Sequence, residues 1–573
     1  MKKFLTIFLT ILAFHTNAQE IIRANPFYVK QSVAGVNPNS FITKWVIPSA
    51  SYALSIPFTT ALANNNFVLD WGDGNTTTVT TNTTPSHTYV NAGTYTITIT
   101  GTCPTINFTS LTTLREIVQW GNIGATSFTC KSSGLTTISA ASSNTFFSSS
   151  LLTSLSAAFQ LTGLTSIPSG LFNSAVNVTN FAGLFQQCPN ITSIPANLFD
   201  SCKKVAQFNN VFYITNITSI PSGLFDSCKL ATTFADAFAS TKITAIPAGL
   251  FKNTKLVTNF SETFLGISTL TTAPPAGLFD SCSNVTTFVG VFMSAKFTSI
   301  PAGLFDSCKK VTTFATAFQQ SLITSIPAGL FDSCRLVTDF STTFRQCTSL
   351  TGIPSGLFNN NRSVTTFSQT FYQCSNASFT SIPTGLFDHT VNVTTFANTF
   401  VNVKLTGIPS GLFDSTVKVT TFTNTFQGTN ITSIPAGLFD RDTLVTVFTS
   451  TFQSCTSLSS IPANLFNYNT KVTAFNNTFS ASGVTSIPTG LFDFNTLATN
   501  FSNVFSSAFI TSIPSSLFTN TIANNFTSAF AGCYSITGAV PDLWNTFPSA
   551  TGTLCFNGDV SASNYASIPT SWK

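Results

Sequence analysis

Few side chains in this sequence could carry acid–base chemistry. The only histidines are His15, His87 and His389, and the only glutamates are Glu20, Glu116 and Glu262. General acid–base catalysis and glycoside hydrolysis need paired carboxylates, or a basic partner, held in a cleft. Outside one recurrent position the aspartates are scattered without an obvious pair: Asp70, Asp73, Asp236, Asp339, Asp442, Asp542 and Asp559. The sequence therefore predicts a non-enzymatic protein with no catalytic residues, although Asp236 or Asp339 beside a basic residue in a pocket would favour an enzyme.

One aspartate position recurs along the chain after a Leu-Phe or similar pair. Its nine members are Asp200, Asp226, Asp280, Asp306, Asp332, Asp388, Asp414, Asp440 and Asp493. Such aspartates commonly accept backbone N–H bonds in turns. Basic residues stand three positions further on in four copies and could pair with these aspartates: Lys203, Lys229, Lys309 and Arg335. A calcium ladder is the alternative, but about 6–8 oxygen ligands usually require converging carboxylates, so neither a metal nor a cofactor is predicted.

The 13 cysteines occupy recurrent positions and form no metal-binding spacing such as Cys-x-x-Cys. Several follow the recurrent Asp-Ser, and others follow a Phe by three residues. Other copies fill the same positions with Thr, Asn, Ser or Gly, which favours a small buried side chain over a disulfide. A bridge between neighbouring copies, such as Cys308 with Cys334, remains open.

Composition excludes several classes of protein. Only 8% of the 573 residues are charged, whereas 43% are hydrophobic and 60 are Phe. A net charge of +5 is too small for a polybasic partner of nucleic acid or membrane surfaces. Residues 1–18 have the charged start, apolar core and small-residue end of a signal peptide. No later apolar stretch is long enough to cross a bilayer, so the sequence predicts a secreted chain without a transmembrane segment.

A repeat explains most of this composition. Fourteen prolines follow the same kind of segment at intervals of 26 or 27 residues, with one interval of 29: Pro168, Pro195, Pro221, Pro247, Pro274, Pro301, Pro327, Pro354, Pro383, Pro409, Pro435, Pro462, Pro488 and Pro514. Such a period is typical of solenoids, in which each copy buries its apolar face against its neighbours. Within a copy, Leu-Thr-Ser-Ile and Val-Thr-Thr-Phe runs predict short strands, each followed by a helical turn.

Three Phe positions recur in every copy, for example Phe331, Phe340 and Phe344. Equivalent residues of stacked copies lie above one another, so we expect continuous Phe ladders inside the solenoid, with an aromatic ligand groove as the alternative. Thr stands three residues before the proline in thirteen of the fourteen copies, and a second Thr row includes Thr312 and Thr338. These rows fit the outward face of a sheet, while an ice- or glycan-binding face is the alternative.

The stretch from Phe41 to Thr102 does not follow the repeat pattern. Asp70-Trp71-Gly72-Asp73-Gly74 predicts a tight turn, and Thr94-Tyr95-Thr96-Ile97-Thr98-Ile99 predicts a strand after His87-Thr88-Tyr89. These motifs resemble the Asp-x-Gly-Asp-Gly and His-x-Tyr signatures of PKD (polycystic kidney disease) domains. That resemblance implies an extracellular immunoglobulin-like β-sandwich in which Asp70, Asp73 and His87 hold turns, with metal binding or catalysis as the minority reading.

The repeats resemble the BspA-like family of bacterial leucine-rich-repeat variants, through Leu-Thr-Ser-Ile-Pro, Leu-Phe-Asp-Ser-Cys, Val-Thr-Thr-Phe and Phe-x-x-Cys. The family implies a secreted or surface-displayed adhesive protein, without naming a partner. The predicted fold is mainly β: a leucine-rich-repeat-like solenoid behind an immunoglobulin-like β-sandwich. The expected segments are a signal peptide (1–18), PKD-like sandwich (36–103), junction and cap (104–140), repeat solenoid (141–533) and divergent C-terminal repeat and cap (534–573).

The leading functional hypothesis is a non-enzymatic adhesion or binding scaffold for an extracellular protein or glycan. A polysaccharide-processing solenoid enzyme and an ice-binding protein remain as alternatives. No nucleic-acid partner is expected, and the oligomeric state is left open. Two irregular segments, Asn359–Arg362 and Ser375–Ser378, are expected to bulge from one face and are the places to look for a binding loop.

Overall fold

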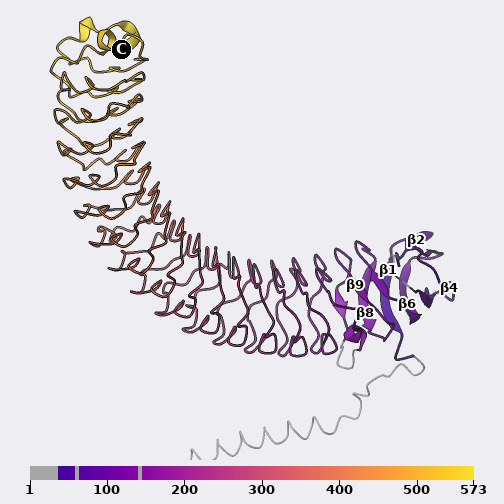
Figure 1. The fold of residues 1–573 in the computed structure, drawn as a ribbon. Helices are drawn as coiled ribbons and strands as arrows, with labels where there is room; N and C mark the ends of the chain where they lie inside the picture. The colour runs from indigo at the N-terminus through magenta and orange to yellow at the C-terminus, as the bar shows by residue number, and fades with distance from the viewer. Residues whose placement is uncertain (1–36, 59–63, 140–144) are drawn as a thin grey trace, which may run out of the picture.

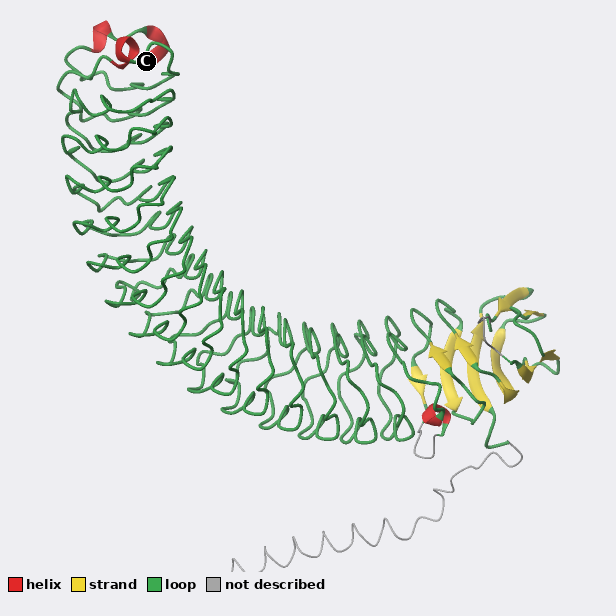
Figure 2. Ribbon diagram, viewed as in Figure 1, coloured by secondary structure: helices red, strands yellow, loops and turns green. Residues whose placement is uncertain are grey.

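The computed structural model describes residues 37–58, 64–139 and 145–573, so the predicted signal peptide lies outside the described residues. A strand-rich module stands at one end, a curved stack of coils follows, and short helices close the other end (Figures 1 and 2). Strands are almost confined to the first module, whereas the coils consist of turns joined by single bridges. The described part is therefore mainly β with almost no helix.

The first module is built on a six-stranded sheet of order β10-β8-β1-β6-β3-β4. Its strands are β1 (Phe41–Ile47), β3 (Asn66–Asp70), β4 (Thr76–Val79), β6 (Gly93–Thr102), β8 (Leu114–Gln119) and β10 (Thr137–Ile138). The predicted alternating strand is confirmed as part of β6, which pairs with β1 and β3 on its two sides. Two further pairs are β2 (Tyr52–Ser55) with β5 (Ser86–Tyr89), and β7 (Thr105–Asn107) with β9 (Ser127–Thr129).

The sheet continues past residue 103, where the sequence suggests a change of module. Strand β8 pairs antiparallel with β1, and β10 pairs parallel with β8. Parallel pairing is also found between β7 and β9 and then from coil to coil. The solenoid thus begins on the edge of the first module's sheet, and one cluster of buried apolar residues extends from Phe41 to Trp572.

Each coil bridges the next at one residue, as Asp339 does with Thr366. Beyond the bridge, alternate backbone N–H groups reach the next coil: Thr342 donates to Ser368 and Phe344 to Thr370. The intervening N–H groups donate within the same coil to the carbonyl three residues earlier, as the Arg345 N–H does to the Thr342 carbonyl. This alternation is possible because Thr342 and Gln346 have φ values of 56° and 58°, in the left-handed region that is uncommon outside glycine.

That backbone differs from the short strands and helical turns expected from the sequence. A residue in the left-handed region ends a strand and a helix alike, and two occur within five residues of each coil, at Thr342 and Gln346. The ladder therefore has one bridge per coil. Between the helix η1 (Phe146–Ser148) and the helix α2 (Leu543–Thr546), the described coils contain turns closed over three residues and no helix.

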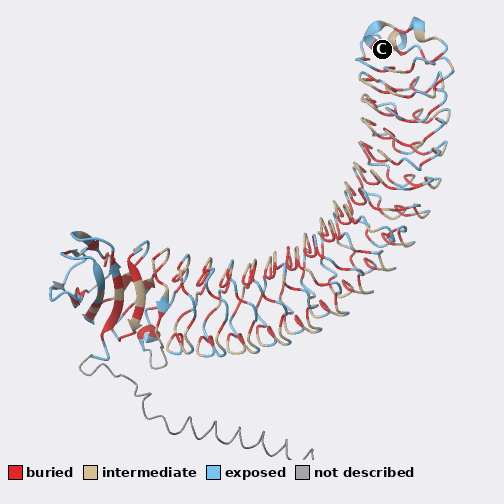
Figure 3. Ribbon diagram, turned by 180° about the vertical axis from the view of Figure 1, so that it is seen from behind, coloured by how far each residue is buried: buried red, intermediate tan, exposed pale blue. Residues whose placement is uncertain are grey.

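The predicted Phe ladders are confirmed. Phe331, Phe340 and Phe344 are fully buried, and their equivalents are buried in every coil of the described array. Buried segments recur in coil after coil along the stack (Figure 3). Ring centroids lie 5.7 Å apart from Phe344 to Phe371, but 6.3 Å apart from Phe331 to Phe358. The coils are thus more widely spaced along the Phe331 ladder than along the Phe344 ladder, as a curved stack requires.

The recurrent aspartate lies in a turn that depends on a glycine. Gly329 has φ +71°, and a Cβ on it would lie 3.0 Å from Oδ2 of Asp332. In the part of the chain that the structure describes, the recurrent aspartates form neither the expected side-chain bonds to backbone N–H groups nor ion pairs with Lys203, Lys229, Lys309 or Arg335, so both expectations are wrong. Among the described residues, the only ion pair of this position joins Asp226 to Lys252 of the next coil, at 2.8 Å.

The last coil is closed by α2 and two 3-10 helices, η2 (Tyr565–Ser567) and η3 (Thr570–Trp572). Trp572 is 7% exposed and lies over Gly552, where any Cβ would collide with its ring. The Phe556 N–H donates to the Trp572 carbonyl at 2.9 Å. The cap therefore covers the end of the Phe ladders and takes up a backbone donor of the last coil.

Candidate ligand-binding site

The conspicuous polar residues of the first module hold its turns, as the sequence predicts. Asp70 Oδ1 accepts the Gly72 N–H at 2.8 Å, and Asp73 Oδ1 accepts the Asn75 N–H at 3.1 Å. His87 Nε2 lies 2.6 Å from Asp73 Oδ2, and its ring stacks on Trp71 at 5.1 Å. Partial burial favours the neutral acid, but the bonds from His87 and Asn75 lower the pKa of Asp73.

Among the described residues, the only side-chain hydrogen bond of the His87 ring is the one to Asp73, and no Ser, Thr or Cys side chain is bonded to it. Ser86, next to His87 in the sequence, accepts a hydrogen bond from the Ser55 hydroxyl across the β2–β5 pair, at 3.0 Å. A nucleophile must lie within hydrogen-bond reach of its base. The arrangement therefore does the work of a turn and supports no acyl transfer.

Within the described ranges of the chain, neither of the two aspartates singled out for enzyme chemistry forms an ion pair with a basic side chain. Asp339 Oδ1 accepts the Ser341 N–H at 2.7 Å and so closes its own turn. Asp236 is hydrogen-bonded to Glu262 of the next coil. Burial, together with the charge and hydrogen bond of Glu262, raises the pKa of Asp236 to about 7.

The Asp236–Glu262 pair was missed in the sequence because its members are 26 residues apart. Aligning the copies would have found it, since both residues precede the third Phe of a copy by two positions. Glycosidase carboxyl groups stand roughly 5–9.5 Å apart to admit a sugar or water between them. Two carboxyl groups in direct hydrogen bond leave no such space, so the pair does not provide a glycosidase site.

Two further carboxyl groups lie inside the solenoid. Asp442 and Asp559 are fully buried, and none of their four carboxyl oxygens has a hydrogen-bond partner among the described residues. Burial, with a smaller contribution from Asp414, raises the pKa of Asp442 to about 9. Burial raises the pKa of Asp559 to about 7. Neither group can reach a ligand.

All 13 cysteines are buried and free, which confirms their expected role as small core side chains. Cys308 and Cys334, the pair considered for a bridge, are both free thiols. Burial raises the pKa of both thiols. Because the thiolate is the reactive form, these side chains are suited to packing and not to chemistry.

The exposed threonine rows use their hydroxyl protons within the solenoid. Thr338 Oγ1 donates to the Thr312 carbonyl at 3.2 Å, the same carbonyl that accepts the Thr338 N–H. The hydroxyl and the N–H of Thr324 likewise both donate to the Thr298 carbonyl. Such bonds follow the second Thr row and most of the row before the proline, and they tie neighbouring coils together. In the row before the proline, no such hydroxyl bond is found among the described residues for Thr192, Thr244, Thr271, Thr298 and Thr380. Hydroxyl protons engaged in this way are not available to a surface ligand.

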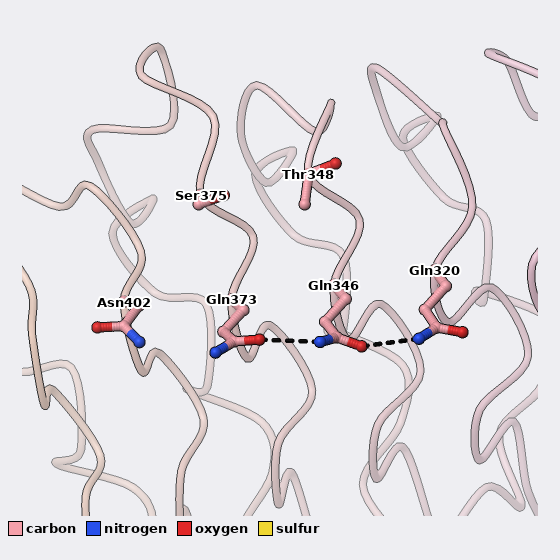
Figure 4. A pocket seen from close by; sticks show the side chains of 6 residues that line it. All are labelled: Gln320, Gln346, Thr348, Gln373, Ser375 and Asn402. Atoms are coloured by element: carbon pink, nitrogen blue, oxygen red, sulfur yellow. Dashed lines mark hydrogen bonds between the residues drawn. The ribbon is translucent and has the colours of Figure 1, made fainter.

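The clearest candidate site is a row of amide side chains on neighbouring coils (Figure 4). Ser294 Oγ donates to Gln320 Oε1 at 3.0 Å, Gln320 Nε2 to Gln346 Oε1 at 3.0 Å, and Gln346 Nε2 to Gln373 Oε1 at 2.9 Å. We call Ser294, Gln320, Gln346 and Gln373 the amide row. Each member has a positive φ, between 56° and 64°, so the backbone itself fixes where these side chains leave the coil.

The amide row forms one side of a surface pocket of about 420 Å³. Its lining is polar and carries no charged side chain: Gln320, Gln346, Thr348, Gln373, Ser375 and Asn402. Ser375 belongs to Ser375–Ser378, one of the two segments expected to bulge, and it lines the pocket. The row was not recognised in the sequence, although Gln stands two residues after the third Phe in three consecutive copies.

The other irregular segment does not bulge. Asn361, in the middle of Asn359–Arg362, is fully buried and takes the position that Cys334 has in the preceding coil. Its Nδ2 donates to the carbonyls of Phe331 and Cys334 at 3.2 and 2.9 Å. The segment keeps the normal repeat length, so its asparagines fill the coil and form no loop.

A second, larger pocket of about 580 Å³ is lined by Val417, Asp440, Arg441, Thr443 and Tyr468. Burial and the nearby Asp414 raise the pKa of Asp440, while Arg441 opposes the shift. Tyr468 and Phe494 of the next coil are 57% and 53% exposed. In contrast to the first pocket, this one carries both signs of charge.

The described residues contain no group of three or more His, Cys, Asp or Glu side chains placed to hold a metal ion. The same part of the chain contains no helix that is both long and apolar enough to cross a bilayer.

Known proteins resemble this chain in structure only. No protein-family model and no curated protein matches the sequence. Similar solved structures include leucine-rich-repeat proteins: Toll in the Drosophila Toll–Spätzle complex (15% identity, TM-score 0.41, covering 73% of this chain and 52% of that chain) and TLR13 with ssRNA13 (11%, 0.35, 64% and 50%). A third is a TDR receptor (13%, 0.36, 68% and 74%).

This chain spans about half the length of the Toll and TLR13 chains, with 52% and 50% covered. The TM-scores of the three are 0.35 to 0.41, too low for an argument about ligands or activity. The repeat array is defined by its own coil-to-coil hydrogen bonds and Phe ladders.

Proposed function

We propose that the chain is a secreted or surface-displayed bacterial repeat protein that acts as a non-enzymatic adhesion or binding scaffold for an extracellular protein or glycan. In this proposal residues 1–18 are a signal peptide, 36–103 a PKD-like module, 104–140 a junction and cap, 141–533 BspA-like repeats and 534–573 a divergent repeat and cap. No cofactor, metal or nucleic acid takes part.

The amide row carries this proposal. Polar, uncharged side chains from three consecutive coils are held in register by hydrogen bonds beside a surface pocket. Ligand sites commonly combine a concave surface with a few fixed polar groups. Three of the carboxyl groups considered for chemistry are engaged elsewhere: Asp73 in a turn, Asp236 with Glu262, and Asp442 in the interior.

The proposal is tested by incubating the full chain with an array of extracellular matrix proteins and glycans, alongside fractionation of expressing cells into surface and medium. We expect saturable binding to at least one ligand, and the chain in the surface or medium fraction. The same preparation is assayed for release of reducing ends from polysaccharides, which a binding scaffold does not cause. Absence of binding to every array member would contradict the proposal, as would steady turnover of a polysaccharide.

A further inference from the structure

The amide row offers a ligand the same pair of groups on successive coils. A Gln side chain has two N–H donors and two carbonyl lone pairs. Gln346 uses one donor toward Gln373 and one lone pair toward Gln320. One donor and one acceptor of this amide remain for a ligand. Gln320 is in the same position, because its carbonyl oxygen accepts from Ser294 and its amide donates to Gln346.

These groups are fixed before any ligand arrives. The bonds along the row hold each amide in one orientation, and the backbone is constrained at the same residues by φ values of 60°, 58° and 56° at Gln320, Gln346 and Gln373. Binding to an already ordered surface avoids much of the entropic cost of immobilising long side chains. The arrangement is therefore suited to a ligand that also repeats from coil to coil.

The chemistry of the lining limits the class of ligand. A polyanion would need Lys or Arg side chains, and the pocket has none. Hydroxyl groups both donate and accept, so a pair of neighbouring hydroxyls matches the free donor and acceptor of one amide. The ligand that fits is a neutral, hydroxyl-rich chain.

Spacing separates a polysaccharide from a peptide. An extended peptide repeats on one face every two residues, at roughly 6.6–6.8 Å. Equivalent Phe rings of the coils that carry the row are 5.7 Å apart, both from Phe318 to Phe344 and from Phe344 to Phe371. A peptide would therefore lose register by roughly 2 Å over two coil steps. A β-linked polysaccharide advances by one pyranose ring per sugar, a length comparable to one coil. Every ring carries oxygen atoms at both edges, so a polar contact can recur at each coil even where consecutive rings are turned over.

We infer that the amide row binds a linear, neutral polysaccharide that runs across the coils, with one sugar near each amide. This inference rests on the binding function proposed above and names its ligand class. Thr348 and Ser375 line the same pocket beside the row, and Ser375 belongs to the two-residue insertion of its copy. A volume of about 420 Å³ is in the usual range for ligand sites and limits direct contact to a short stretch of chain.

The test is isothermal titration calorimetry of the full chain with neutral β-linked hexasaccharides of glucose, xylose and mannose. An acidic hexasaccharide and an extended polar peptide serve as comparison probes. Gln346→Ala removes the central amide and both of its bonds, so we expect affinity for the bound hexasaccharide to fall by about tenfold or more. Gln427→Ala is the control, because it breaks another Gln–Gln bond between neighbouring coils, to Gln453 at 3.1 Å, one position earlier in the coil and outside the pocket. The affinity of this variant for the hexasaccharide should stay within about twofold of the wild type.

Each outcome decides between the inference and the function on which it rests. Equal affinities of the wild type and Gln346→Ala for a neutral hexasaccharide, with unchanged melting temperatures, would place the site elsewhere and overturn the inference. Binding of only the acidic probe or the peptide would overturn the ligand class. If no hexasaccharide binds but an array protein does, the inference fails and the binding function stands; if nothing binds, both fail.

Discussion

A single buried position shows how the coils accept polar side chains. It holds Cys334 in one coil, Asn361 in the next, and Asp442 and Asn469 further along. Asn469 fits because its amide donates to the carbonyls of Phe439 and Asp442, both at 3.0 Å. A carboxylate has no proton to donate there. Burial accordingly raises the pKa of Asp442 and keeps the group neutral in the folded chain.

This position gives a pH-dependent prediction. The pKa of Asp442 is about 9 when folded and about 4 when unfolded. The unfolded chain therefore releases this proton first, and stability falls as pH rises from about 4 to about 9. Asp442→Asn removes that loss and supplies donors for the carbonyls of the preceding coil. We expect stability at pH 7 to rise by about 1–3 kcal/mol, measured by thermal and urea unfolding at several pH values.

Asp306→Asn is the control, because it makes the same chemical change at an exposed carboxylate. It should leave the unfolding profile nearly unchanged. A residual decline with pH is expected in Asp442→Asn, since the pKa values of Asp236 and Asp559 are also raised. If Asp442→Asn were less stable than the wild type at pH 7, the prediction would be contradicted. The buried carboxyl group would then stabilise the folded chain although its oxygens have no hydrogen-bond partner among the described residues.

At the scale of the element, the unit is the coil. Hydrogen bonds of its backbone and its buried hydroxyls pair the polar groups, whereas its apolar side chains fill the interior. Thr343 is fully buried, and its hydroxyl donates to the carbonyls of Phe340 and, in the preceding coil, Phe314 at 2.7 and 3.1 Å. Backbone bonds between coils pair the N–H groups, and the Thr343 hydroxyl pairs the carbonyl groups of Phe340 and Phe314. The coil therefore satisfies its buried backbone groups without a regular strand or helix. Phe rings fill the remaining interior.

Removing one ring should weaken the stack locally. Phe344 is fully buried between Phe318 and Phe371, at 5.7 Å from each. Phe344→Ala leaves a cavity, with an expected cost of about 3–5 kcal/mol. Because coils contact mainly their neighbours, hydrogen exchange should accelerate in the coils next to residue 344 and not in distant ones. Local exchange is the appropriate measurement, since long arrays need not unfold in one step.

Phe494→Ala is the matched control, because this ring is 53% exposed. It should change stability by no more than about 0.5 kcal/mol. Uniform acceleration of exchange along the whole chain in Phe344→Ala would contradict the nearest-neighbour description and indicate one cooperative unit.

At the scale of the whole molecule, a single buried core connects the sheet of the first module to the cap. An open end of such a stack presents an apolar face and an unpaired ladder edge. At the first end, β8 and β10 continue the sheet into the coils. At the other, Trp572 lies against Gly552 and within 6.1 Å of the Phe526 ring.

The cap therefore has a testable role in keeping the chain monodisperse. Deleting residues 570–573 removes η3, the Trp572 ring and the carbonyl that accepts the Phe556 N–H. We expect the last coils to exchange hydrogen faster and the chain to self-associate through the exposed end, as measured by light scattering coupled to size-exclusion chromatography.

Lys573→Ala is the control for that deletion, since it removes only a cation over the Tyr565 ring at 4.8 Å. It should leave the mass in solution unchanged. An unchanged mass and unchanged exchange in the deletion variant would show that the cap is dispensable for closing the stack.

The period, the Phe ladders and the buried cysteines could be predicted from the sequence, because a residue that recurs once per coil either faces inward in every copy or in none. The turn roles of Asp70, Asp73 and His87 were implied by the resemblance to PKD domains. The backbone within a coil could not be predicted, because left-handed conformations at residues such as Thr342 arise from bonds to neighbouring coils. The sheet that links the first module to the solenoid is decided by pairing between distant strands.

The same division applies to the site. The insertion at Ser375 was visible as an irregular copy, whereas Asn359–Arg362 looked irregular but fills the interior normally. Gln320, Gln346 and Gln373 become one surface only when the coils stack and their amides bond to one another. By itself the sequence determined what must be buried, because apolar periodicity is a local property. Only the tertiary structure decided which polar groups meet, because hydrogen bonds between coils join residues 26 or 27 positions apart.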